Sequence, residues 1–266
     1  MGLPTMKELG SDLLLTTAFQ RWQPVPMPYL FMVGFMVSWH LGWFWLSFLC
    51  LVFVFSACST STHDVVHRSL GHSARATEWL LFLLGMPILE SGHAYRATHL
   101  AHHQRFPRHD DPEGEAAHQP MWKVLMTGPV FLPRLWIWAW RANHDRADQR
   151  RWLILEALLP ILGIGLGLVL FPWTDSVLAY ALIVLVSSWF YPLFAVYLPH
   201  RHFEEGLPIR QSWTVRGRLI PQMFLPLAYH LEHHLYPLVP SHNLPILAQR
   251  LQPWLDEAGV KPVRVL

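Results

Sequence analysis

Three apolar segments with almost no charge dominate the pattern of this chain. Residues 27–61 and 176–198 contain no charged side chain, and residues 153–171 contain only Glu156, near the start of the segment. The sequence Pro-Trp-Thr-Asp at 172–175 separates the last two segments and predicts a tight turn. Because about 20 apolar residues cross a ~30 Å hydrocarbon core as a helix, these two segments predict a transmembrane hairpin.

The first segment, residues 27–61, is too long for one straight span. At about 1.5 Å per residue, a single helix of this length would overshoot the hydrocarbon core. We therefore prefer two short spans that turn near His40-Leu41-Gly42, with a single long tilted span as the alternative. Residues 79–89 are apolar but too short to span, and residues 121–140, rich in tryptophan, predict a helix lying at the membrane interface.

The positive charges indicate an orientation. Of the 20 Lys and Arg residues, 11 lie between Arg68 and Arg151 and 7 lie in residues 199–266, whereas the turn at 172–175 has none. The positive-inside rule then places residues 62–152 and 199–266 in the cytoplasm. The prediction is a single membrane-embedded domain over residues 1–266. It is an all-α, multi-pass protein of the cytoplasmic membrane, with about four transmembrane helices in two hairpins and a cytosolic helical cap.

The composition agrees with a membrane protein and narrows the chemistry. Hydrophobic residues make up 52% and charged residues 14%, whereas a soluble domain is about one quarter charged. A net charge of +2 gives no reason to expect a nucleic-acid partner. The two cysteines, Cys50 and Cys58, both lie in an apolar run, which argues against a disulfide framework and a cysteine-rich zinc site. The 17 histidines are the unusual feature.

Eight of these histidines fall into three short clusters. Residues at i, i+3 and i+4 share one face of a helix, so each cluster would project its imidazoles in one direction. The predicted hairpin lies between the second and third clusters, and it returns all three to the cytoplasmic face. The clusters consist of His63 and His67, then His99, His102 and His103, then His230, His233 and His234.

Imidazoles in this number and spacing predict a metal site. Neutral imidazole suits iron, copper, nickel and zinc. Eight are too many for one tetrahedral zinc, and they suit two metal ions in a joint site. One of His200 and His202, which follow the last apolar segment, is a candidate ninth ligand. The carboxylates expected to accept hydrogen bonds from the second ring nitrogens are Asp64, Asp110, Asp111 and Glu232.

The clusters resemble the histidine boxes of the membrane fatty acid desaturase superfamily, which includes carotenoid ring hydroxylases and ketolases. The resemblance rests on HDVVH at 63–67, HLAHH at 99–103 and HLEHHLYP at 230–237, and it extends over about residues 55–245. It implies a non-haem site of two iron ions at the cytosolic membrane face, with O2 as co-substrate. The implied iron ligands are His63, His67, His99, His102, His103, His230, His233 and His234, with His200 as a ninth.

The resemblance favours His200 over His202 as the ninth ligand. Some desaturases have a further histidine ligand about thirty residues before the third box, and His200 lies thirty residues before His230. Those desaturases also have an asparagine four residues before that ligand, which holds a water on one iron. This chain has Val196 there, so the water-mediated contact is not expected.

The implied function is O2-dependent oxidation of a lipid. A fatty acid desaturase-type enzyme, which introduces a double bond or hydroxyl into a lipid chain, is the first interpretation. A β-carotene ring hydroxylase or ketolase is the alternative, favoured by the chain length and by the sequence LPHR at 198–201. The lipid substrate is accordingly an acyl lipid or a carotenoid. No haem-binding segment accompanies the boxes, so we expect a separate ferredoxin- or cytochrome-type electron donor.

Two other classes of membrane protein deserve comparison. A metal transporter or metal-storage protein would place ionisable residues within its spans, where this chain offers little besides Glu156. We expect Glu156 to reach the interface. A b-type cytochrome would place paired histidines deep in facing helices, whereas these clusters lie at the ends of the apolar segments. The chain also lacks a nucleophile elbow and a phosphate-binding loop, so neither acyl transfer nor nucleotide binding is indicated.

Overall fold

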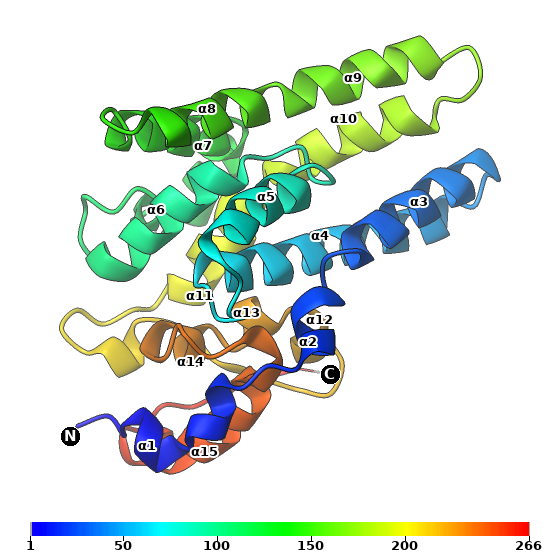
Figure 1. Cartoon of the computed structure of the whole chain (residues 1–266). Helices are drawn as coiled ribbons and strands as arrows, with labels where there is room; N and C mark the ends of the chain where they lie inside the picture. The colour runs from blue at the N-terminus through cyan, green and yellow to red at the C-terminus, as the bar shows by residue number, and fades with distance from the viewer. Residues whose placement is uncertain (1, 266) are drawn as a thin grey trace.

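The computed structural model describes residues 2–265, and the chain is mostly helical (Figure 1). The longer helices are α3 (Met27–His40), α4 (Phe44–Val66), α5 (Ala74–Gly85), α6 (Gly92–Arg105), α7 (Met121–Ala142), α8 (Ala147–Ala157), α9 (Leu159–Leu170), α10 (Ser176–Ser188) and α15 (Leu244–Glu257). The shorter ones are α1 (Met6–Leu9), α2 (Ala18–Trp22), α11 (Leu198–His200), α12 (Ile220–Met223), α13 (Leu225–Ala228) and α14 (His230–Leu235). The remaining elements are the 3-10 turns η1 (Ser11–Leu14), η2 (Gly114–His118), η4 (Pro208–Arg210) and η5 (Ser241–Asn243), the π-helical turn η3 (Pro192–Tyr197), and the parallel pair β1 (Val215–Arg216) and β2 (Val263–Arg264).

The first apolar segment forms two packed helices, α3 and α4, which meet at the turn predicted near His40-Leu41-Gly42. The chain turns between α3 and α4 at Gly42, whose φ of +75° is readily adopted by glycine. Buried hydroxyls hold the pair together near this turn, with Ser38 Oγ and Ser47 Oγ 2.8 Å apart. At Gly34 a Cβ would lie 3.0 Å from Cys50 Sγ, so the small residue permits the close approach of the two helices.

Three helical stretches of the described chain are long and apolar enough to cross a membrane. They are residues 44–66, 147–170 and 176–200, and an 18-residue window within each has a mean hydropathy of 1.8, 2.4 and 1.9 respectively. The last two correspond to the predicted hairpin and extend beyond its predicted limits of 153–171 and 176–198. Helix α3 has 14 residues, about 21 Å, which is short for an independent span. The fourth span therefore stays a prediction.

The two hairpin turns lie at the same end of the molecule (Figure 1). Trp39 Nε1 at the end of α3 donates to Asp175 Oδ1, 3.2 Å away in the turn between α9 and α10. At Gly167 of α9, a Cβ would lie 2.7 Å from the Cα of Leu178, so glycine is needed for α9 and α10 to approach this closely. The first histidine box lies in the last turn of α4, at the opposite end of that helix.

Helix α7 includes residues 121–140, the segment predicted to lie at the membrane interface. One side of this helix is exposed and the other is buried. Trp122, Met126 and Val130 are exposed along one side, whereas Leu135 and Ala139 are buried on the other. An apolar exposed side of this kind suits a helix that contacts lipid.

The N-terminal and C-terminal helices pack together near the histidine-bearing end of α4. Leu247, Leu251 and Leu255 of α15 form a fully buried core with neighbouring parts of α1 and α14. The backbone N–H and the hydroxyl of Ser241 both donate to Asp64 near the end of α4, at 3.0 and 2.7 Å. These contacts hold the C-terminal helices against the end of α4 that carries the first histidine box.

Candidate metal centre

Four separate elements bring nine histidines together. Helix α4 carries the first box in its last turn, α6 carries the second box, α14 the third, and α11 ends at His200. Each H-x-x-H-H box is helical, as its spacing predicted. The nine imidazoles divide into two adjoining sets.

The first set combines all three boxes. His63, His67, His99 and His233 are buried, and one nitrogen from each lies within 4.8 Å of the others. His103 joins this set, because its Nε2 lies 2.8 Å from that of His233 and 3.2 Å from that of His99.

The second set consists of His102, His200, His230 and His234, whose ring nitrogens also lie within 4.8 Å of one another. His200 is fully buried, and its Nε2 lies 3.2 Å from that of His102 and 2.9 Å from that of His230. The alternative candidate, His202, is exposed and lies outside both sets. The sets meet where the rings of His103 and His234 stack with centroids 4.3 Å apart.

The hydrogen bonds of His200 and His230 show that their Nε2 atoms, which face each other inside the second set, carry lone pairs. Nδ1 of His200 donates to the carbonyl of Gln211 at 2.7 Å, and Nδ1 of His230 donates to the carbonyl of Pro226 at 3.1 Å. A carbonyl only accepts, and a neutral imidazole has one N–H. The two Nε2 atoms, 2.9 Å apart, therefore face each other without a proton between them. This arrangement is unfavourable unless a cation binds there, so the residues fit a metal.

The environment keeps these rings neutral. Burial, with the charges of neighbouring histidines, lowers the pKa of His67 to about 2 and that of His230 to about 3. The same two causes hold the pKa values of His99, His103, His233 and His234 well below the usual range. Lone pairs for metal binding are thus available at physiological pH.

Two buried carboxylates in the loop after α6 orient the second box. Asp111 Oδ2 accepts from Nδ1 of His102 at 2.6 Å, as the sequence predicted. Glu113 Oε2 lies 3.2 Å from Nδ1 of His99, and its other oxygen accepts from the Thr98 hydroxyl at 2.7 Å. Burial raises the pKa of Glu113 to about 7. Sequence reasoning missed Glu113, although its place two residues after Asp111 was a usable signal.

The other three predicted acceptors were wrong. Asp110 is half-exposed and pairs with Arg105 and Arg108. Glu232 accepts from Thr214 and from Arg216 at 2.8 and 2.7 Å instead of from an imidazole. The carboxylate of Asp64 lies 3.9 Å from Nδ1 of His63, beyond hydrogen-bonding distance, and is used by Ser241.

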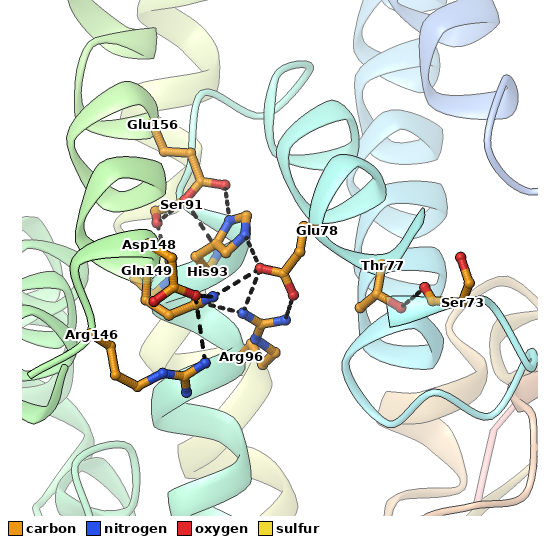
Figure 2. Close-up of polar contacts among 11 residues, drawn as sticks. Ser73, Thr77, Glu78, Ser91, His93, Arg96, Arg146, Asp148, Gln149 and Glu156 are labelled. Carbon is orange, nitrogen blue, oxygen red and sulfur yellow. Dashed lines mark hydrogen bonds and ion pairs between the residues drawn. The ribbon is translucent and has the colours of Figure 1, made fainter. Parts of the chain in front are cut away.

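The expectation that Glu156 reaches the interface was also wrong. Its side chain is fully buried and accepts from Nδ1 of His93 at 2.7 Å. His93, which lies outside the three boxes, sits between Glu156 and Glu78 (Figure 2). These residues lie apart from the two histidine sets.

The fold and site define a helical protein with three helices able to span a membrane and two adjoining histidine sets suited to metal ions. The chain belongs to the fatty acid desaturase family, whose sequence profile matches residues 37–264. This confirms the superfamily resemblance of the three boxes.

Two characterised proteins show the breadth of this similarity. The chain is 22% identical to a chloroplastic omega-3 fatty acid desaturase of Ricinus communis over 274 aligned positions, which cover 85% of this chain and 56% of that protein. It is 26% identical to a beta-carotene ketolase of Paracoccus sp. (strain N81106 / MBIC 01143) over 213 positions, which cover 75% of this chain and 76% of the ketolase. The chain thus spans little more than half of the desaturase but most of the ketolase.

Proposed function

We propose that this protein is an O2-dependent, non-haem di-iron oxidoreductase that attacks C–H bonds of a membrane lipid. The observation that carries the proposal is the convergence of nine imidazoles in two adjoining sets, with the facing Nε2 atoms of His200 and His230 free of protons, in a member of the fatty acid desaturase family. His63, His67, His99, His103 and His233 would hold one iron, and His102, His200, His230 and His234 the other.

Bound iron supplies O2 activation and the oxidising power to break an unactivated C–H bond. The chain's own residues prepare the centre for this chemistry. Asp111 fixes the ring of His102 through Nδ1, which leaves Nε2 as the ligand atom. Most of the nine rings are buried and exclude water, whereas His103 and His234 are partly exposed. We infer that O2 and substrate approach from the side of these two rings.

The first candidate reaction is desaturation or hydroxylation of an acyl lipid, which the family membership supports. The second is ketolation or hydroxylation of a carotenoid ring, which is favoured by the mutual coverage of 75% and 76% with the beta-carotene ketolase. Both require electrons, and we propose a separate ferredoxin- or cytochrome-type donor. The positive-inside distribution supports a cytoplasmic position for the boxes.

Expression in two hosts tests the reaction. One host accumulates β-carotene and the other accumulates saturated acyl lipids, and mass spectrometry of the extracted lipids reads the product. Loss of two hydrogens from acyl chains indicates desaturation, whereas oxygen added to carotene indicates ring oxidation. His233→Ala is expected to abolish either change, and the exposed His202→Ala is the matched control.

Metal analysis tests the class of protein. We expect two non-haem irons per chain and no Soret absorption. Zinc alone, with no O2-dependent activity after iron reconstitution, would contradict the proposal.

A further inference from the structure

A second buried cluster of charged residues lies at the beginning of α6, apart from the nine histidines (Figure 2). His93 is at its centre, with a side chain only 1% exposed. Its Nδ1 lies 2.7 Å from Glu156 Oε1 and its Nε2 lies 3.1 Å from Glu78 Oε2. The ring also stacks on Trp152, with centroids 5.0 Å apart and planes 7° from parallel.

Both ring nitrogens of His93 therefore face a carboxylate oxygen. An ionised carboxylate only accepts hydrogen bonds, so a ring held between two of them donates from both nitrogens. Burial works to raise the pKa of Glu78, but hydrogen bonds from Arg96 and Gln149 and the charges of Arg96 and His93 lower it to about 2. The stacked indole adds a favourable cation–π contact.

The cluster is balanced in charge and joins three helices. Arg96 donates to both oxygens of Glu78, at 2.6 and 3.1 Å. Two anions, Glu78 and Glu156, therefore face two cations, His93 and Arg96. Glu78 belongs to α5, the two cations belong to α6, and Glu156 and Gln149 belong to α8. Because buried charges are costly unless paired, each member depends on the others.

Glu156 also caps the helix that carries the second box. Its Oε2 accepts from the hydroxyl of Ser91 at 2.5 Å and from the backbone N–H of His93 at 3.2 Å. Ser91 is the N-cap residue of α6. A carboxylate at this position satisfies free N–H groups and interacts favourably with the helix dipole. The spanning stretch 147–170 is thereby fixed to the start of α6.

The orientation of α6 matters because this helix serves both histidine sets. His99 and His103 belong to the first set and His102 to the second. For a ring nitrogen about 6 Å from the helix axis, a rotation of about 10° moves the atom by roughly 1 Å. Functional sites tolerate about 0.5 Å. A small rotation of α6 would therefore disturb both sets together.

We propose that His93 and Glu156 are positioning residues whose charged contact fixes the rotation of α6 and so holds His99, His102 and His103 in a metal-binding geometry. The inference rests on the proposed metal centre and adds residues that lie outside the three boxes. Packing alone supplies part of this restraint, since at Gly92 a Cβ would lie 2.3 Å from the carbonyl oxygen of Leu81. The charged contact adds a restraint that can be removed without changing the fit of the backbones.

The test uses cobalt(II) alone, titrated into the purified full-length metal-free protein in detergent. The d–d absorption of bound cobalt reports ligand geometry, which a purely stabilising role would not alter. His93→Gln removes the cation and keeps one hydrogen bond. We expect it to weaken cobalt binding at least about tenfold and to shift the d–d bands. The matched control is His144→Gln, because His144 is an exposed histidine that pairs with Asp145 at 2.7 Å.

Further variants separate geometry from folding. The double variant His93→Gln/Glu156→Gln removes one cation and one anion, so it restores charge balance and is expected to recover part of the cobalt affinity. Glu156→Gln alone keeps the shape of the side chain and removes its charge. If His93→Gln does not fold, the cobalt affinity and d–d spectrum of Glu156→Gln test the same contact. A lowered melting temperature with unchanged cobalt affinity and spectrum in either single variant would overturn the proposal. Failure of the unsubstituted protein to bind cobalt would overturn the metal centre itself, which is a distinguishable result.

Discussion

Asp111→Asn is the substitution whose effect the structure defines most closely. Both carboxylate oxygens of Asp111 are in use: Oδ2 accepts from Nδ1 of His102 at 2.6 Å, and Oδ1 accepts from the backbone N–H of Glu113 at 3.0 Å. The side chain is fully buried, so water cannot replace a lost partner. An asparagine offers one acceptor oxygen, and its amide group would face a donor on the other side.

The size of the effect follows from this geometry. One of the two N–H groups must lose its acceptor, and a buried unsatisfied donor costs about 1–3 kcal/mol. If His102 is the group that loses its acceptor, its ring is no longer fixed as an Nε2 ligand, and loss of such a partner weakens metal binding by about 10- to 100-fold. That factor corresponds to about 1.4–2.7 kcal/mol, in agreement with the hydrogen-bond estimate.

The assay is iron content per chain and the apparent iron(II) affinity of the purified protein. Asp110→Asn is the matched control, because Asp110 is the adjacent residue with the same side chain, half-exposed in ion pairs with Arg105 and Arg108. Such exposed pairs contribute about 1 kcal/mol or less. Equal iron content and affinity in the two variants would refute the assigned role of Asp111.

Three further predictions follow from the same structure. His200→Gln is expected to lower the iron content from two per chain towards one, whereas the exposed His202→Gln leaves it unchanged; elemental analysis distinguishes them, and equal loss in both would contradict the division into sets. The metal-free protein should lose stability as the pH falls below 6.5, because His67 and His230 have folded pKa values of about 2 and 3 and the unfolded chain binds more protons there. Each of the two contributes about 2 kcal/mol of this loss at pH 5, and unfolding curves that do not change between pH 7 and 5 would argue against buried neutral rings. Gly92→Ala should cost about 1–3 kcal/mol because its Cβ would meet Leu81, whereas Gly165→Ala, with open space around it, should change the melting temperature little; a reversed order would contradict the packing of α6 on α5.

The outline of the fold could be predicted because its signals are local. Runs of uncharged residues mark the spanning helices, and the i, i+3, i+4 spacing marks the face of each box, since both depend on neighbours within a few turns. The turn near Gly42 was predicted as well, and it ends α3 at His40 after 14 residues.

The sequence by itself determined that eight histidines face together in three groups. Only the tertiary structure decided how they divide: within one box, His102 joins the second set and its neighbour His103 the first, because the position of α6 between the other elements sets which ring points where. The sequence also did not predict which groups accept hydrogen bonds from the outer nitrogens of the rings. The carbonyls of Gln211 and Pro226 hold two rings, and every residue has a carbonyl, so the sequence carries no mark of which is used. The role of Glu156 could not be predicted for the same reason. Its carboxylate is accommodated in an apolar helix only because the fold places His93 against it.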